Sequence, residues 1–317
     1  MSYQPVADPA SIEEAAALLR AGRICAFPTE TVYGLGGDAT DPDAVLEIFA
    51  AKGRPRFNPL IAHCADLDMA RRFGRIEGLA LELAERFWPG PLTLVVPLVE
   101  ASGLSDIATA GLKTVALRVP ARPLARDLIA SVGRPLAAPS ANPSGRLSPT
   151  SAEHVRAAFE GRVPVLDGGP CEAGVESTIV TVGPDGITQL RAGALPREEI
   201  EAAMGVAVAV ASHDAAISAP GMLKSHYAPG AKLRLAAAAP EPGEAYLGFG
   251  RLPEGIEGEA LDLSPHGDLR EAARNLFGFL ARLDETGCAR IAVAPIPREG
   301  LGEAINDRLE RAAAPRD

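Results

Sequence analysis

Residues 23–36 read Arg-Ile-Cys-Ala-Phe-Pro-Thr-Glu-Thr-Val-Tyr-Gly-Leu-Gly, an apolar run that turns into hydroxyls and glycines. Residues 23–27 predict a short buried strand that Pro28 ends, because proline cannot donate to a strand ladder. Glycines in the following segment allow a backbone to approach a ligand closely, and threonine hydroxyls can hold a small polar one. The stretch therefore predicts a strand that delivers a polar binding segment, as in α/β proteins.

The same segment imitates a dinucleotide fingerprint, Gly34-x-Gly36-x-x-Ala39. These glycines do not immediately follow the strand, and no helix is expected to open on them before Asp41. The sequence also lacks a Gly-x-x-x-x-Gly-Lys-Ser/Thr phosphate loop. We therefore expect any nucleotide to bind in another way.

Short helices and strands alternate outward from this stretch. Ser11 and Glu14 have the spacing of a capping box whose helix Gly22 closes, and Asp41 caps a second helix that runs to Gly53. We further expect strands at residues 59–63, 92–98, 114–119, 135–138, 163–166, 177–182 and 187–191, helices at 79–87 and 124–131, a capping box at 150–153 and a short helix from residue 196.

The composition changes after residue 204, where small residues lead into a segment, 219–229, bracketed by prolines. Such a stretch resists helix and strand formation and predicts an extended linker. Strands at 232–236, 245–249 and 289–295 around one long helix, 269–286, predict a small second α/β domain. With 317 residues the chain exceeds what one core usually serves. We expect a first domain over 8–205, a linker over 206–231 and a C-terminal domain over 232–317.

The overall charge limits the classes of function. The 31 Lys and Arg face 41 Asp and Glu, a net charge of −10, which argues against a nucleic-acid binder that uses its whole surface. No leader segment and no apolar run of about 18 residues is evident, so we expect a soluble, cytoplasmic protein with no membrane partner. Four scattered cysteines, at 25, 64, 171 and 288, lack zinc-ligand spacing and are predicted to be free packing residues.

Two cations, Lys52 and Arg54, lie close together at the glycine-broken end of the second helix. They could converge on one polyphosphate or carboxylate. The alternative is a solvated charge that the helix dipole favours. His63, at the end of the next strand, is either a satisfied strand-end histidine or a ligand.

Ser140 and Asn142 follow a buried strand and precede prolines. Their side chains would point out of the strand end, where α/β sheets commonly hold ligands, although a turn-capping role explains them equally. Ser148, before the second capping box, reads as a turn residue.

Two arginines, Arg118 and Arg191, lie inside apolar strands, as does Ser177. A buried guanidinium needs an anion or a carboxylate partner, because a dry, unpaired charge is costly. An internal Asp or Glu would serve either one. Two such arginines beside Lys52 and Arg54 favour an anionic substrate.

Taken together, these segments resemble the threonylcarbamoyl-AMP synthase family, whose catalytic unit is the YrdC-like domain. The resemblance rests on Pro-Thr-Glu-Thr-Val-Tyr-Gly-Leu at 28–35, the Lys-x-Arg pair at 52–54 and the Ser-x-Asn pair at 140–142. The segment 219–229 and the ending at 300–309 are similar to the long, two-domain form. The resemblance implies a twisted mixed sheet with flanking helices, plus a small Rossmann-like α/β C-terminal domain.

The family reaction joins L-threonine, bicarbonate and ATP into threonylcarbamoyl-adenylate and releases pyrophosphate. It is the first step of the threonylcarbamoyladenosine modification of tRNA, which a separate transferase complex completes. The resemblance therefore implies a pocket shared by three anions, in which cations and hydroxyls position the reactants. Mg²⁺ is expected to bridge phosphate oxygens, with no protein ligands of its own.

The same resemblance implies a role for each matching residue. Catalysis is expected of Lys52, Arg54, Ser140 and Asn142. L-Threonine binding is expected of Thr31, His63, Arg118, Ser140 and Ser177. ATP binding is expected of Lys52, Arg54, Asn58, Thr114, Asn142, Ser148, Arg191 and Tyr227. Tyr227 would close over the nucleotide and exclude water. No residue stands out as a general base, so positioning and charge neutralisation are expected to dominate.

Two alternatives have different chemistry. A basic patch with Arg54, Arg56, Arg71 and Arg72 could bind duplex RNA weakly, although the net charge opposes this as the main role. A related carbamoyl-adenylate enzyme would use carbamoyl phosphate and form its product without threonine.

Overall fold

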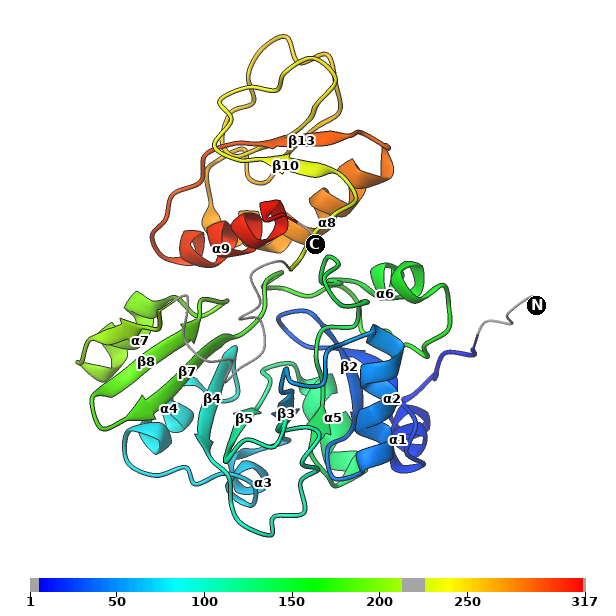
Figure 1. The fold of residues 1–317 in the computed structure, drawn as a ribbon, viewed down its shortest axis with the longest axis vertical. Coiled ribbons are helices and arrows are strands. Elements are labelled where there is room, and N and C mark those ends of the chain that lie inside the picture. Colours follow the sequence, from blue (N-terminus) through cyan, green and yellow to red (C-terminus); the bar gives the residue numbers. More distant parts are fainter. Residues whose placement is uncertain (1–5, 213–225, 316–317) are drawn as a thin grey trace.

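Two β-sheets organise the chain, a large one from the first two thirds of the sequence and a small one from the last third (Figure 1). The structure is a computed structural model that describes residues 6–212 and 226–315. Helices α8 (Leu269–Glu285) and α9 (Leu301–Ala313) of the upper unit face the lower unit (Figure 1). Within the described residues, no helix is long and apolar enough to cross a membrane.

The large sheet is mixed and has the order β1-β2-β6-β3-β5-β4-β7-β8-β9. Three neighbouring pairs, β3/β5, β4/β7 and β8/β9, are parallel and the others are antiparallel. The strands are β1 (Cys25–Pro28), β2 (Tyr33–Asp38), β3 (Ile61–His63), β4 (Leu92–Pro97), β5 (Thr114–Arg118), β6 (Leu136–Ala137), β7 (Thr178–Gly183), β8 (Gly186–Arg191) and β9 (Val208–Val210). The predicted mixed sheet with flanking helices is therefore confirmed.

Seven helices accompany this sheet in the described part of the chain: α1 (Ile12–Arg20), α2 (Pro42–Lys52), α3 (Leu67–Arg71), α4 (Leu79–Phe87), α5 (Pro123–Val132), α6 (Ala152–Phe159) and α7 (Arg197–Met204). Asp41 caps α2 by accepting from the Asp43 amide, and Gly53 ends it at φ 59°, a left-handed conformation that favours glycine. The chain turns sharply there, so Lys52 and Arg54 leave the helix end together.

Two local predictions were wrong, and one strand was not predicted. The unpredicted strand is β2, which residues 33–38 form; a Cβ on Gly36 would lie 2.6 Å from the Phe27 ring, so glycine permits close pairing with β1. The helix N-cap is Ser151 rather than Thr150, and its hydroxyl accepts from the His154 amide. Residues 163–166 form only an isolated bridge, between Val165 and Ala26.

The small sheet is entirely parallel, in the order β10-β13-β11-β12. Its strands are β10 (Lys232–Arg234), β11 (Ala245–Gly248), β12 (Ala260–Asp262) and β13 (Arg290–Val293). This α/β unit was predicted with one helix, but α9 is a second one, whose buried residues include Ala304, Ile305 and Leu309.

The two units share an apolar core and several polar contacts. Val32 and Val175 of the lower unit pack into the core of the upper unit. Gln189 donates to Glu303 at 2.8 Å across the junction. Most of the predicted linker, residues 213–225, lies outside the described residues. The sheets are thus joined as one body around the site described below.

Candidate active site

A small cavity lies where strands of the large sheet end beneath the upper unit. Its volume is about 50 Å³. Polar and charged side chains dominate its lining, which consists of Thr29, Thr31, Val32, Gly34, Arg54, Ile61, His63, Arg118, Ala138, Pro139, Ser140, Glu176, Ser177, Arg191, His226 and Tyr227. Segments from residue 29 to residue 227 therefore meet at one point.

Hydroxyls and Arg118 form one wall of this cavity. The Thr29 and Thr31 hydroxyls lie 2.8 Å apart, and Arg118 Nη1 donates to Thr31 Oγ1 at 2.9 Å. Arg118 also forms an ion pair with Glu30 at 2.6 Å, so this arginine has an internal carboxylate partner. Burial and the charge of Arg118 lower the pKa of His63 to about 3, so its imidazole is neutral.

Two buried cations, Lys52 and Arg54, belong to this site, and of the two only Arg54 lines the cavity directly. Lys52 Nζ donates to Ser140 O at 2.6 Å and also to Asn142 O. Arg54 donates to Asn58 O and, at 3.0 Å, to Pro59 O. Within residues 6–212 and 226–315, no carboxylate lies within ion-pair distance of Lys52 or Arg54. Carbonyl oxygens thus orient both cations without neutralising them.

Desolvation acts on the same two cations. Burial, with the nearby charge of Arg54, lowers the pKa of Lys52 well below its usual value. Burial lowers the pKa of Arg54 to about 10, with Arg191 acting in the same direction. Because each cation is disfavoured where it lies, a bound anion would stabilise both.

The start of β7 and the end of β8 bring Arg191 to Ser177. Arg191 Nη2 donates to the carbonyl of Ser177 at 2.8 Å and to its hydroxyl at 3.1 Å. The close approach depends on Gly193, because a Cβ there would lie 2.3 Å from the Ser177 carbonyl carbon. Ser177 Oγ also lies 2.8 Å from Thr93 Oγ1.

Sequence reasoning missed Glu176 and Arg308. Glu176 accepts from Ser148 Oγ at 2.5 Å and from Arg308 Nε at 2.8 Å. Arg308, on α9, is 1% exposed and donates to the Ala192 carbonyl at 2.9 Å. Glu176 could have been noticed as a carboxylate beside Ser177 in an apolar stretch. Nothing near Arg308 in the sequence indicates a partner 132 positions away.

Tyr227 fills the roof of the cavity. Its φ is 62°, and only 2% of its surface is exposed. The ring centroid lies 5.0 Å from the Arg308 guanidinium and 5.7 Å from the stacked Phe277 ring. His226 packs against it at 4.1 Å. Both aromatic side chains therefore occupy space between the two units.

Most of the predicted site residues converge here. Eight line the cavity directly: Thr31, Arg54, His63, Arg118, Ser140, Ser177, Arg191 and Tyr227. Lys52, Asn58, Asn142 and Ser148 contact lining residues or their neighbours through the bonds given above. Thr114 does not line the cavity, because it starts β5 whereas Arg118 ends it, roughly 13 Å further along the strand.

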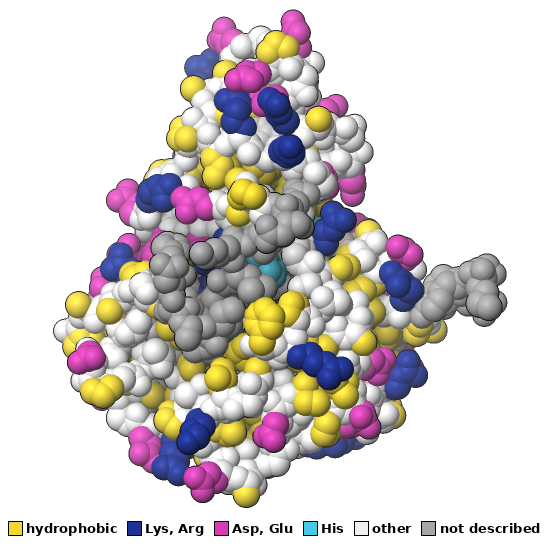
Figure 2. Space-filling model, in the orientation of Figure 1, with side chains coloured by type: hydrophobic (Ala, Val, Ile, Leu, Met, Phe, Trp, Pro, Cys, Tyr) yellow, Lys and Arg dark blue, Asp and Glu magenta, His cyan; other side chains and the backbone are white. Residues whose placement is uncertain are grey.

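The basic patch expected for RNA is contradicted in part. Arg54 is 8% exposed and points inward, so it cannot join a surface patch. Arg56, Arg71 and Arg72 are exposed. On the face shown in Figure 2, basic side chains are interspersed with acidic ones.

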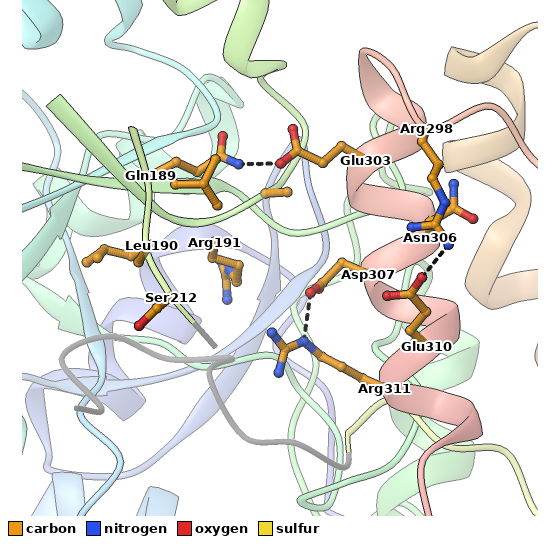
Figure 3. A pocket seen from close by; sticks show the side chains of 13 residues that line it. Gln189, Leu190, Arg191, Ser212, Arg298, Glu303, Asn306, Asp307, Glu310 and Arg311 are labelled. Atoms are coloured by element: carbon orange, nitrogen blue, oxygen red, sulfur yellow. Dashed lines mark hydrogen bonds and ion pairs between the residues drawn. The ribbon is translucent and has the colours of Figure 1, made fainter. Parts of the chain in front are cut away.

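A larger cavity, about 460 Å³, lies between β8, β9 and α9 (Figure 3). Arg191 lines both cavities. Charged side chains of the larger one pair with each other: Arg311 with Asp307 at 2.9 Å and Arg298 with Glu310 at 2.7 Å. The smaller cavity is the better candidate, because it has the cations without carboxylate partners beside hydroxyls.

The chain matches two family models. Residues 17–193 match the one described as Telomere recombination, and residues 195–314 match the one described as Threonylcarbamoyl-AMP synthase, C-terminal domain.

Relatives resemble the chain over nearly its whole length. The threonylcarbamoyl-AMP synthase of Bacillus subtilis is 41% identical, over 98% of this chain and 94% of the relative. The threonylcarbamoyl-AMP synthase of Pyrococcus abyssi is 43% identical, over 95% and 94%. The crystal structure of P. abyssi Sua5 complexed with L-threonine superposes with a TM-score of 0.86 at 40% identity, covering 95% of this chain and 94% of that one.

Proposed function

The chain belongs to the threonylcarbamoyl-AMP synthase family, and on that premise we propose how its cavity makes threonylcarbamoyl-AMP from L-threonine, bicarbonate and ATP. One observation carries the proposal: the buried cations Lys52 and Arg54 have no carboxylate partner in the described part of the chain, and threonine and serine hydroxyls and Arg118 line the same cavity as Arg54. Cations without partners suit phosphates, and the hydroxyl wall suits an amino acid.

The reaction proceeds in two balanced steps. The threonine ammonium and bicarbonate combine into a carbamate, releasing one water and one proton. A carbamate oxygen then attacks the α-phosphorus of ATP, the bond from that phosphorus to the bridging oxygen breaks, and pyrophosphate leaves. Lys52, Arg54 and Arg191 would stabilise charge on the phosphates, while Arg118, Thr31 and Ser177 would position the carbamate. His63 is neutral and would therefore add no charge to the site.

Tyr227 and His226 would have to move for ATP to enter. A cavity of about 50 Å³ holds only a few waters, since one water needs about 10–15 Å³ by a comparable measure. With the nucleotide bound, Tyr227 would cover it and exclude water from the mixed anhydride, which hydrolyses easily.

Mg²⁺ would enter with ATP. The amide oxygens of Asn58 and Asn142 are buried and accept no hydrogen bond from the described residues. Asn142 Nδ2 donates to two carbonyls, of Pro143 and Arg146, which fixes its Oδ1 as the free acceptor. Amide oxygens are hard ligands that suit Mg²⁺, so Asn58 and Asn142 would be the residues that hold it beside the phosphates, in place of the expectation from the sequence that it has no protein ligands. When bound, Mg²⁺ supplies charge neutralisation on the phosphates.

The product would be consumed by a transferase that modifies tRNA, since a mixed anhydride is an activated acyl donor. A cytoplasmic location fits that partner. The exposed residues Arg56, Arg71 and Arg72 leave a weak RNA contact as a secondary proposal.

Substitution of the two cations tests the function. Purified protein receives ATP, L-threonine and ¹³C-bicarbonate, and mass spectrometry measures labelled threonylcarbamoyl-AMP and pyrophosphate. Lys52→Ala and Arg54→Ala should each lose product formation by about 100-fold or more while circular dichroism stays unchanged, since removing a preorganised charge costs roughly 3–4 kcal/mol. Arg56→Ala, two residues away and exposed, is the matched control. Near-normal turnover in both variants, or product without threonine, would refute the proposal.

A further inference from the structure

Glu176 is a carboxylate in a cavity proposed to hold three anions. It lines the cavity and is 6% exposed. Phosphate and carbamate oxygens would be repelled by it, because like charges disfavour each other at short range. The two reaction steps give it no task, so its position needs a separate explanation.

Partners from both units hold Glu176 as an anion. Oε2 accepts from Arg308 Nε at 2.8 Å, and Oε1 accepts from the Ser148 hydroxyl at 2.5 Å. Burial alone would raise the pKa of Glu176, but Arg308, Arg191 and Ser148 outweigh burial and lower it to about 2. Glu176 is therefore ionised at neutral pH and can only accept hydrogen bonds.

The same contact defines what Ser148 can do. Because its hydroxyl proton is donated to Glu176, the Ser148 oxygen offers only lone pairs to any further partner. Glu176 and Ser148 thus form a pair of acceptors. Such a pair complements a donor, which phosphate and carboxylate oxygens at neutral pH do not have.

The donor must also be uncharged. Arg308 and Arg191 both act on Glu176, and their charges would repel an ammonium group. An ammonium held by an ionised carboxylate would also stay protonated, and a threonine amine in that state could not attack carbon. A neutral hydroxyl is the group that fits.

We propose that Glu176, with Ser148, accepts a hydrogen bond from a ribose hydroxyl of ATP and so selects ribonucleotides. The assignment rests on the proposed function, which places ATP in this cavity. Ser177 follows Glu176 directly and belongs to the wall where the carbamate would meet the α-phosphorus. The ribose is bonded to that phosphate, whereas the adenine amino group lies a full ring system further away. Arg308 is then a positioning residue, through which the C-terminal unit sets nucleotide selectivity.

Nucleotide analogues test the assignment without any substitution. The substrates are ATP, 2′-deoxy-ATP and 3′-deoxy-ATP, each with threonine, and 2-aminobutyrate in place of threonine with ATP. Wild-type protein should lose kcat/KM by about 10- to 150-fold with one of the deoxynucleotides, the value of a hydrogen bond to a charged group. Equal kcat/KM for all three nucleotides would overturn the assignment.

Variants then locate the acceptor. In Glu176→Gln the ratio of kcat/KM between ATP and the discriminating deoxynucleotide should fall toward 1, and Ser148→Ala should reduce it as well. Glu303→Gln, which changes an interdomain carboxylate outside this cavity, is the matched control and should keep the wild-type ratio. A merely structural role of Glu176 would lower activity on all nucleotides and preserve the ratio.

Further outcomes would overturn the assignment. One is an unchanged ratio in folded Glu176→Gln. Another is that this variant loses discrimination between threonine and 2-aminobutyrate instead, which would place the threonine hydroxyl at Glu176. If wild-type protein made no threonylcarbamoyl-AMP from ATP, the proposed function itself would fall, and the assignment with it.

Discussion

Replacing Arg308 with methionine should destabilise the protein strongly, although Arg308 lies in the C-terminal unit and does not itself line the cavity. The side chain is 1% exposed, so methionine keeps most of its volume but removes the charge. Glu176 is then left buried without its guanidinium, a change that costs about 3–5 kcal/mol in comparable cases.

The pKa of Glu176 also indicates how strongly its surroundings favour the ionised carboxylate. Its pKa is lowered from 4.5 to about 2 because Arg308, Arg191 and Ser148 outweigh the effect of burial and favour the ionised form. A tenfold change in proton affinity corresponds to about 1.4 kcal/mol, so this preference is worth about 3 kcal/mol. Arg308 is the largest contributor that lowers this pKa, so its removal should weaken the preference for the ionised form, in the same direction as the loss of about 3–5 kcal/mol expected for an unpaired buried charge.

Urea unfolding at pH 7, followed by the fluorescence of the single tryptophan, Trp88, and by circular dichroism, measures the effect. Urea is preferred to guanidinium because it does not screen charges. Arg308→Met with Glu176→Gln should recover part of the loss, since neither unpaired charge remains buried. A loss under 1 kcal/mol in the single variant, or no recovery in the double variant, would refute the reasoning.

Two further predictions concern Tyr227 at the roof of the cavity and the stability of the protein below neutral pH. Tyr227→Phe should keep the stacking on Phe277 and unfold like wild type. Tyr227→Ala should speed hydrolysis of the product to AMP several-fold, because water can then reach the mixed anhydride, and chromatography would measure AMP against intact product. Identical hydrolysis in both variants would contradict the role of Tyr227 as a lid. Burial lowers the pKa of His63 and His226 to about 3, so the folded state keeps them neutral while the unfolded chain binds protons below about pH 6.5. The free energy of unfolding should therefore fall as the pH is lowered from 6.5 to 5, with a slope that approaches about 1.4 kcal/mol per pH unit for each histidine near pH 5. His63→Asn should remove the contribution of one histidine to this slope. An unchanged slope in that variant would count against a buried neutral His63.

Local patterns in the sequence predicted the elements that position the site. The apolar runs at 92–98 and 187–191 became β4 and β8, and the Asp41 cap with Gly53 placed Lys52 and Arg54 together at a helix end. Strand β2 escaped prediction because its glycines usually indicate a loop. They serve instead to bring β2 against the Phe27 ring, a contact between strands that no local pattern encodes.

The contacts that complete the site are longer in range. Whether Arg118 meets an internal carboxylate could not be decided from spacing, because Glu30 lies 88 positions away in the chain. Arg308 is a stronger case, since an arginine on an amphipathic helix usually faces solvent. Only the docking of α9 against the end of β8 buries it.

The two units therefore differ in what they contribute to one site. The large unit supplies cations and hydroxyls at strand ends and at the end of α2, where they can hold phosphates and a carbamate. The small unit supplies Arg308, which holds Glu176 ionised and lies 5.0 Å from the Tyr227 ring. Val32, within the hydroxyl segment, packs into the core of the small unit, so any displacement of that unit disturbs the hydroxyl wall as well. The C-terminal unit is thus a structural part of the cavity, and its removal should alter the site rather than simply shorten the chain.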